Sequence, residues 1–583
     1  MEEEASGPGP GGASPGAGAR ADRRRRLLQV LSRRGTIRAW YAGLLAFFVV
    51  LILAPTLYVL WYVISGWGLI QDLVLPNPTL VGAIGPALWL SFGVALTVAG
   101  IDLVAGLPLA WLLVRKDFRG KDWVNTIIDS PLAVTTAGLG LSVVLFWGIP
   151  WAASGSSIVP PPGALGLTSD AFLILMFLHL TTTFPYMVRS LAAILEEIEI
   201  EYENAARAAG ASRLTAVRTI TLPMFRSGMA TGLILVIAKA LSDTGGAFAA
   251  LGLIGACGSG GPSTDVCNGT GLINYWKNLS ADPLRPEFTP ALALVSALMI
   301  ALSLALLVVL KYVAQRLHFP LRRVWPGVEG RLSRGSVPTL RNLAAIGFLV
   351  GFILVPSFFF LLYGVVGTPA AGLDWRGFWG AVGVSFLVGG LATAVDLAAG
   401  IPMAILITRG RVRWLGRLLD ALVNVPYIVP SAALGISLGL FWKAQRTLVP
   451  SDLVLVIMAH IAFTFPFVVR NVVGALEQLD PALEETARTL GAKPIQTFRR
   501  VVFPSVRPAI LAGAIMAFTR SVGETGATVS VSTETVTIPV LIVNLIRSGS
   551  FYEASIAQVA LLAVSFAAIL GLRMVVQRRR RRG

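Results

Sequence analysis

The sequence predicts an all-helical membrane protein of about twelve transmembrane helices, arranged as two parallel six-helix repeats. Of its 583 residues, 55% are hydrophobic and only 14% are charged, which is too apolar for a soluble globular protein of this size. Apolar stretches of about 20 residues, the length that crosses a hydrocarbon core of about 30 Å, recur along the chain. One polar segment also occurs twice, at 184–223 and at 465–504.

Twelve spans are expected, six in each half. They lie at approximately 41–64, 86–114, 125–149, 171–192, 226–253, 289–312, 342–364, 378–408, 419–442, 452–472, 507–531 and 554–575. The predicted organisation is a disordered, basic N-terminus over 1–35, a first repeat over 36–320, a cytoplasmic linker over 321–341, a second repeat over 342–577 and a basic tail over 578–583. The first apolar run is expected to be a retained helix, because no small-residue cleavage site follows it.

The formal charge of +17 is concentrated in runs before the first span and at the end of the chain. Nucleic-acid binding is one interpretation of such runs. In a multispanning protein we favour another, in which Lys and Arg stay on the cytoplasmic side and meet anionic lipid. No nucleic-acid partner is therefore expected, and the lipid bilayer is. With the N-terminus inside, the basic loops and both copies of the repeated segment fall in the cytoplasm, so both termini are expected there, in a plasma or inner membrane.

The repeated segment separates two apolar helices in each half. The first copy reads FPYMVRSLAAILEEIEIEYENAARAAGASRLTAVRTITLP and the second reads FPFVVRNVVGALEQLDPALEETARTLGAKPIQTFRRVVFP. A short helix, a break at Gly210 or Gly491 and a second helix stopped by Pro223 or Pro504 fit this spacing. The segment is expected to bind a cytoplasmic partner.

This pattern, Glu-x-Ala followed by a glycine and then a proline, resembles the cytoplasmic coupling loop of the permease subunits of binding-protein-dependent ABC importers. The matching residues are Glu485, Thr486, Ala487, Gly491 and Pro504 in the second copy and Asn204, Ala205, Ala206, Gly210 and Pro223 in the first. The first copy departs from the pattern at Asn204, where the family usually has Glu, and Glu203 is an acidic residue one position earlier. The resemblance implies the type I importer transmembrane fold, two cytoplasmic ATP-binding cassette subunits and an extracellular or periplasmic substrate-binding protein.

Ionisable residues also recur at equivalent places within the predicted spans, where burying a charge is costly. The pairs are Asp102 with Asp396, His179 with His460, Lys239 with Arg520 and Asp243 with Glu524. Lys239 and Asp243 are four residues apart, as are Arg520 and Glu524, so each pair is expected to meet on one helix face. Their segments, AKALSDTGGA and TRSVGETGAT, resemble a motif of importers for ferric iron, thiamine, molybdate and sulfate. The resemblance implies a place on the translocation path, and the alternative is a buried structural ion pair.

The remaining polar residues each have two interpretations. The two histidines are either ligands for a ferric cargo or hydrogen-bonded structural residues, and no resident metal site is expected. Asp102 and Asp396 either anchor neighbouring helices or lie on the pathway. Cys257 and Cys267, the only cysteines, lie in one outer loop and are either joined by a disulfide or unpaired.

Catalytic motifs are missing from the sequence. It contains no G-x-x-x-x-G-K-[ST] segment, so the chain is not expected to be its own ATPase, and ATP with Mg²⁺ is expected on partner subunits. No cofactor is expected on this chain. The leading hypothesis is a fused permease that imports a small solute, with ferric iron as the first choice and thiamine, molybdate, sulfate or another small solute as alternatives. A secondary transporter driven by an ion gradient is the alternative class.

Overall fold

The computed structural model describes residues 34–150, 163–257, 266–316, 325–332, 336–367, 372–410, 412–443, 451–532 and 534–581. The predicted tail before residue 34, parts of the predicted linker and the last two residues of the basic tail lie outside these ranges. Within them the chain is helical, and the only β structure is a bridge between Gly148 and Thr168. The predicted all-helical class is confirmed.

The helices of the first half run in the following order. They are α2 (Arg34–Phe47), η1 (Phe48–Leu53), α3 (Ala54–Ser65), α4 (Trp67–Leu73), α5 (Pro78–Arg115), α6 (Lys121–Ile127), η2 (Ser130–Ala133), α7 (Thr136–Trp147), α8 (Ala171–Glu197), α9 (Ile200–Ala208), α10 (Arg213–Ala216), η3 (Val217–Thr221), α11 (Leu222–Ser242), α12 (Gly245–Leu253), α13 (Gly269–Leu279) and α14 (Phe288–Arg316). The short α15 (Pro326–Leu332) lies between the halves.

The described residues of the second half repeat this order, and among them no counterpart of α4 is present. Its helices are α16 (Val337–Phe348), η4 (Leu349–Leu354), α17 (Val355–Val366), α18 (Trp375–Arg409), α19 (Arg413–Leu422), α20 (Val425–Ile428), α21 (Ser431–Lys443), α22 (Asp452–Gln478), α23 (Pro481–Thr489), α24 (Pro494–Thr497), η5 (Phe498–Val502), α25 (Phe503–Val522), α26 (Gly526–Val531), α27 (Ile538–Arg547) and α28 (Phe551–Arg581). The predicted duplication is therefore visible helix by helix.

The first helices of the two halves are exchanged. Helix α3 packs on α21 of the second half, and α17 packs on α7 of the first. The Ser437 hydroxyl donates to the carbonyl of Pro55 at 2.7 Å and accepts from the Val59 amide at 2.9 Å. Ser142 donates in the same way to the carbonyl of Pro356 at 2.6 Å. These serines satisfy backbone groups beside prolines within apolar helices, where no water is at hand, and they join the halves into one body.

The number of unbroken spans is lower than the predicted twelve. Eight helices of the described chain are long and apolar enough to cross a membrane, and eleven result if each of three bent pairs counts as one span. The predicted spans 125–149 and 419–442 are each bent by 104° next to a proline-containing turn. The predicted spans 226–253 and 507–531 end early, because the chain leaves the helix between α11 and α12 and between α25 and α26.

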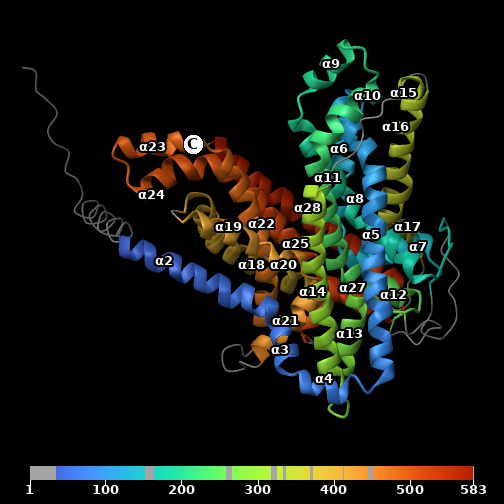
Figure 1. Ribbon diagram of the computed structural model, residues 1–583. Helices are drawn as coiled ribbons and strands as arrows, with labels where there is room; N and C mark the ends of the chain where they lie inside the picture. The colour runs from blue at the N-terminus through green and yellow to red at the C-terminus, as the bar shows by residue number, and fades with distance from the viewer. Residues whose placement is uncertain are drawn as a thin grey trace, which may run out of the picture.

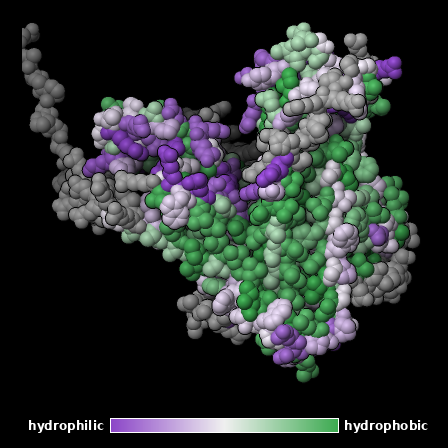
Figure 2. Space-filling view, in the orientation of Figure 1, coloured by the Kyte–Doolittle hydropathy of each residue, from purple (hydrophilic) through white to green (hydrophobic). Residues whose placement is uncertain are grey.

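The molecule has two different ends (Figure 1). Helices α9 and α10 lie at one side of the upper end and α23 and α24 at the other side, whereas α4 and α13 lie toward the lower end. Figure 2 shows a broad hydrophobic zone across the middle and hydrophilic residues gathered over α23 and α24. This is the surface of a multi-pass membrane protein. We call the end with α9, α10, α23 and α24 the coupling end and the opposite one the distal end.

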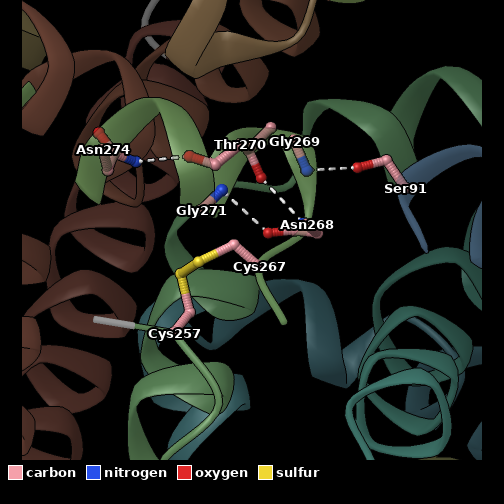
Figure 3. The surroundings of a disulfide bond; sticks show 8 residues. All are labelled: Ser91, Cys257, Cys267, Asn268, Gly269, Thr270, Gly271 and Asn274. Atoms are coloured by element: carbon pink, nitrogen blue, oxygen red, sulfur yellow. Dashed lines mark hydrogen bonds between the residues drawn. A yellow bond between two sulfur atoms is a disulfide. The ribbon is translucent and has the colours of Figure 1, made fainter. Parts of the chain in front are cut away.

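At the distal end, Cys257 and Cys267 form a disulfide with Cα atoms 4.9 Å apart (Figure 3). It joins the segment after α12 to the start of α13, where the Asn268 side chain caps the helix by accepting from the Gly271 amide at 2.9 Å. Helix α13 then reaches the other half, since the Ser530 hydroxyl donates to Asn274 at 2.9 Å. The distal ends of the two halves are thus tied together.

Candidate functional site

The two copies of the repeated segment fold alike. Gly210, with φ +94°, follows the C-cap of α9, and Gly491, with φ +85°, follows the C-cap of α23. In both copies the glycine amide and the following amide donate to carbonyls of the helix, as from Gly491 to Arg488 and from Ala492 to Ala487, both at 3.0 Å. Glycine adopts this left-handed conformation without a steric cost, so it ends the helix there. The predicted short helix and glycine break are confirmed.

The prediction that Pro223 and Pro504 stop the second helix is wrong. In the second half one helical run extends from Pro494 to Val522 through Pro504, and in the first half the run from Arg213 continues through Pro223 to Phe225. A wide π-helical turn, η3 or η5, ends two residues before the proline in each copy. Such a turn relaxes the hydrogen-bond ladder where proline has no N–H to offer.

Most of the repeated segment faces outward. Asn204 and Ala205 in α9 and Glu485 and Thr486 in α23 are exposed, whereas Ala206 and Ala487 are half-buried. Apolar side chains are exposed beside them: Ile200, Tyr202, Leu483 and Leu490. Each segment therefore presents a short helix with a mixed polar and apolar surface, the kind of surface that binds a protein groove.

One carboxylate on each short helix points inward. Glu203 Oε1 lies 3.3 Å from Arg115 Nε at the end of α5 and accepts from the Thr221 hydroxyl at 3.0 Å. Glu484 Oε1 lies 3.0 Å from Arg409 Nε at the end of α18. These ion pairs fasten α9 and α23 to the longest helices of the two halves. The sequence prediction missed Glu484, although glutamate stands at the same position of both copies.

The same comparison explains the departure at Asn204. Glu203 is the counterpart of Glu484, and both are buried; Asn204 is the counterpart of Glu485, and both are exposed. Glu203 therefore holds α9 in place and does not supply the surface carboxylate that Asn204 lacks. The first segment presents one negative charge fewer at that position than the second.

The linker contacts the first segment through α15. Glu329 in α15 accepts from the Thr215 hydroxyl at 2.5 Å and lies 2.7 Å from Arg218 Nη2. The Thr215 hydrogen bond, a backbone hydrogen bond from Trp325 and the charge of Arg218 together hold the pKa of the Glu329 carboxyl below its ordinary value, against the opposing effect of burial. This contact joins α15 to the helix that follows Gly210.

Within the apolar zone, Asp102 and Asp396 occupy equivalent buried positions. The Thr183 hydroxyl donates to Asp102 Oδ2 and the Thr464 hydroxyl donates to Asp396 Oδ2, each at 2.6 Å. These bonds join α5 to α8 and α18 to α22. The geometry favours the interpretation of the two aspartates as helix anchors over a place on a pathway.

The cluster of the second half is fully connected. His460 Nδ1 lies 2.6 Å from the Ser521 hydroxyl and Nε2 lies 2.9 Å from the Thr528 hydroxyl. Arg520 forms the predicted ion pair with Glu524, but not on one helix face, because α25 ends at Val522. The Ala527 amide donates to Glu524 at 3.0 Å. Every member has a partner, which is the arrangement that makes buried polar groups tolerable in an apolar surrounding.

The cluster of the first half is looser. The predicted ion pair of Lys239 and Asp243 does not form. Asp243 follows the end of α11 in an extended conformation, and its Oδ2 atom lies 3.8 Å from His179 Nδ1. Neither of those two atoms has a hydrogen-bond partner. Alanines at 240 and 247 stand where the second half has the serine and threonine that hold His460. Lys239 makes no ion pair within the described part of the chain.

A cavity lies between the two clusters. Its walls come from α8 and α11 of the first half and from α20, α21, α22 and α25 of the second. The lining residues are Tyr186, Lys239, Ser242, Pro426, Tyr427, Val429, Ser431, Phe463, Phe467 and Arg520. Two of the predicted pathway residues, Lys239 and Arg520, thus meet at one place. Asp243, Glu524, His179, His460, Asp102 and Asp396 are not among the lining residues.

The two histidines are not brought together as ligands. His179 faces Asp243, and His460 is held by two hydroxyls. Within the described ranges no three His, Cys, Asp or Glu side chains are grouped so that they could hold a metal ion. The geometry favours structural roles for both histidines.

Comparisons with known proteins agree with this architecture. The family model described as "Binding-protein-dependent transport system inner membrane component" matches residues 102–321 and 400–583, one match in each half. The sulfate transport system permease protein CysT of Salmonella typhimurium is 37% identical over 180 residues, or 27% of this chain and 64% of that protein. CysT of Escherichia coli is 37% identical over 182 residues, 28% of this chain and 65% of its own length. These matches span less than two thirds of either relative.

Proposed function

Because this chain belongs to the family of binding-protein-dependent transport system inner membrane components, we propose that it is a fused ABC importer permease whose best-supported cargo is sulfate. Both halves of the transmembrane pathway lie on one polypeptide. A substrate-binding protein would deliver the solute at the distal end, and two separate ATP-binding subunits would supply the energy at the coupling end. The chain itself contributes no ATPase site.

The observation that carries the proposal is the duplicated segment around Gly210 and Gly491. Two exposed short helices, each fastened by a buried Glu–Arg pair to a long membrane helix, stand on opposite sides of the coupling end (Figure 1). A force on α9 or α23 would be passed directly to α5 or α18. An ion-gradient transporter has no need of two such matched segments.

The same geometry supports alternating access by rocking of the halves. The distal ends are joined by α13, whose Lys277 donates to the carbonyls of Val529 and Ser532 in the other half, the latter at 2.6 Å. The two coupling segments are meanwhile apart. We expect ATP to draw the two ATP-binding subunits together, bring α9 toward α23 and open the distal contact, and we expect hydrolysis to reverse the motion. In this scheme both termini and the coupling end face the cytoplasm.

Sulfate replaces ferric iron as the preferred cargo. The relatives named above are sulfate permeases, and the expectation of iron finds no support among them. The cavity wall also offers two cations and no carboxylate, which disfavours a multivalent cation. Sulfate was an alternative in the sequence-based hypothesis, and molybdate is the related oxyanion named there.

Purification of the tagged chain in mild detergent, followed by reconstitution with its co-purifying partners, tests the proposal. The expected result is a co-purifying ATP-binding subunit and ATP-dependent uptake of radiolabelled sulfate that excess molybdate or unlabelled sulfate reduces. Recovery of no ATPase, with uptake driven by an ion gradient and not by ATP, would contradict the proposal and favour a secondary transporter. A complex that hydrolyses ATP and transports iron would overturn only the cargo.

A further inference from the structure

We propose that α19 carries a binding site for the headgroup of an anionic phospholipid, in which Arg413 and Arg417 hold the phosphate. The inference goes beyond the proposed function and does not depend on the cargo. Helix α18 ends at Arg409 and α19 begins at Arg413. Figure 1 shows α19 beneath α23 and α24, and Figure 2 shows the hydrophilic surface of the coupling end giving way to the hydrophobic zone at this level. The site therefore lies where lipid headgroups are expected.

One side of α19 is fixed against the rest of the fold. Gly416 and Leu419 are buried, and a Cβ atom at Gly416 would stand 2.6 Å from the carbonyl oxygen of Ile407, so α19 packs on the end of α18 at a distance that only glycine allows. The carboxylate of Asp420 lies 2.6 Å from Arg470 Nη1 in α22. The one acidic residue of α19 is thereby neutralised, and the helix is held in one orientation.

The other side of α19 is exposed and has two rows of side chains. Arg413 and Arg417 are four residues apart and form one row, and Trp414 and Leu418 form the next, with exposed fractions of 63% and 44%. A basic row beside a row of Trp and Leu is typical of a helix at a membrane surface. Tryptophan prefers the level of the headgroups, where its ring meets apolar chains and its N–H meets water.

The two arginines are available to a ligand. Neither side chain forms a hydrogen bond or an ion pair with another residue of the described chain. A guanidinium binds phosphate through two parallel hydrogen bonds, and two guanidinium groups on one helix face attract an anionic headgroup. An acidic protein surface would satisfy the arginines alone. A phospholipid places phosphate and acyl chains side by side, in the order of the two rows of α19.

The first half has a matching helix, which serves as an internal comparison. Helix α6 follows α5 as α19 follows α18. Trp123 of α6 stands six residues before an aspartate, as Trp414 does, and is 74% exposed. In both halves this aspartate lies 2.6 Å from an arginine of the next long helix, Asp129 from Arg189 and Asp420 from Arg470.

The charges of the two helices differ. Asp122 and Thr126 stand in α6 at the places of the two arginines, and Lys121 Nζ lies 3.0 Å from the Asp117 carboxylate. Helix α6 thus keeps the aromatic anchor and lacks the pair of available cations. We therefore expect the headgroup at the second half alone, close to the ion pair of Arg409 with Glu484 that holds the short helix α23.

Native mass spectrometry of the delipidated permease–ATPase complex, titrated with phosphatidylglycerol in detergent, tests the site. We expect the tightest site to prefer phosphatidylglycerol to phosphatidylcholine with the same acyl chains, and we expect millimolar inorganic phosphate to leave the lipid bound. Arg413→Gln should weaken this binding about fivefold, and Arg413→Gln combined with Arg417→Gln roughly thirtyfold, as follows from the attraction of an anionic membrane for each arginine.

Two further variants serve as controls. Arg376→Gln removes an exposed arginine beside the exposed Trp375, at the opposite end of α18, and should leave the affinity unchanged. Asp122→Arg combined with Thr126→Arg gives α6 the basic row of α19 and should add a second site of similar affinity. Thermal unfolding of every variant distinguishes lost binding from misfolding.

The outcomes separate this inference from the proposed function. Equal phosphatidylglycerol affinity of the wild type and the double arginine variant would overturn the site, and so would displacement of the lipid by inorganic phosphate, which would indicate a site for the free anion. Loss of the ATP-binding subunits from the double variant, with unchanged lipid binding, would show that α19 binds protein. Failure of these subunits to assemble with the wild-type chain would contradict the proposed function, and the same titration of the chain alone would still test the lipid site.

Discussion

The two halves of the molecule have the same geometry at the coupling end, but their buried polar residues within the membrane make different contacts. At the coupling end each half has a glycine at positive φ, a buried glutamate and an arginine at the end of a long helix, in the same geometry. In the membrane, His460 has two hydroxyl partners and Arg520 has Glu524, whereas Lys239 has no ion pair and His179 lies 3.8 Å from its nearest charged neighbour.

This difference indicates what each region has to do. In the proposed function one ATP-binding subunit would dock on each segment, which would explain why both halves have the same geometry at the coupling end. A single cargo would pass between the halves, so their polar residues within the membrane need not be the same. In the second half the histidine and the arginine each have close polar partners, whereas Lys239 of the first half makes no ion pair within the described residues. The linker adds a further asymmetry, since Glu329 contacts only the first segment in the part of the chain described.

The largest effect is expected from Arg520→Gln. It leaves the Glu524 carboxylate buried without its partner, which costs about 3–5 kcal/mol of folding free energy. Lys239→Gln removes a cation that has no ion pair and should change stability by about 1 kcal/mol or less. Thermal unfolding of the two variants in the same detergent measures the difference. Equal destabilisation would mean that Lys239 is neutralised as fully as Arg520.

Gly491→Pro and Gly210→Pro should destabilise the fold less than Arg520→Gln does, but each should abolish transport. Proline cannot adopt the observed φ of +85° or +94°, and the local distortion costs about 3 kcal/mol. ATP-dependent uptake should be lost in both variants.

Gly549→Pro is the matched control, because Gly549 also has a positive φ but follows α27 and lies outside both coupling segments. It should reduce stability similarly while the ATP-binding subunits still co-purify. Loss of uptake from only one of the two coupling variants would break the equivalence of the segments.

The histidines should differ by a moderate amount. His460→Ala leaves the hydroxyls of Ser521 and Thr528 without their shared partner and should cost about 2 kcal/mol more than His179→Ala. The cavity left by the imidazole is common to both variants and cancels in the comparison. Chemical denaturation of the two proteins tests the expectation. A greater cost for His179 would show that its contact with Asp243 is the stronger one.

The smallest effect concerns Glu329. Because its pKa in the folded chain is lowered by Thr215, Trp325 and Arg218, the carboxylate stabilises the linker contact above its unfolded pKa of about 4.3, and this contribution is lost as the pH falls through the lowered value. In Glu329→Gln the free energy of unfolding should depend less on pH at acid pH, and above pH 7 it should be slightly lower than in the wild type. The same acid dependence in the variant and the wild type would contradict a role for this carboxyl.

The sequence could predict what depends on local pattern. Helical spans, the duplication and the glycine breaks follow from hydropathy and from the conformational freedom of Gly210 and Gly491. The sequence could not predict where a helix would stop within an apolar run, so Lys239 and Asp243 were expected on one face although the chain leaves the helix between them. The anchors of Glu203 and Glu484 were hidden because their arginine partners lie 88 and 75 residues away in the chain, at positions 115 and 409.

The stoichiometry of the native complex tests the central claim most directly. If one chain supplies two equivalent coupling segments, native mass spectrometry of the intact assembly should find two ATP-binding subunits bound to a single copy of this chain. Gly210→Pro or Gly491→Pro should then reduce the number to one. An assembly in which two copies of this chain share the two ATP-binding subunits, or in which none is bound, would contradict the account.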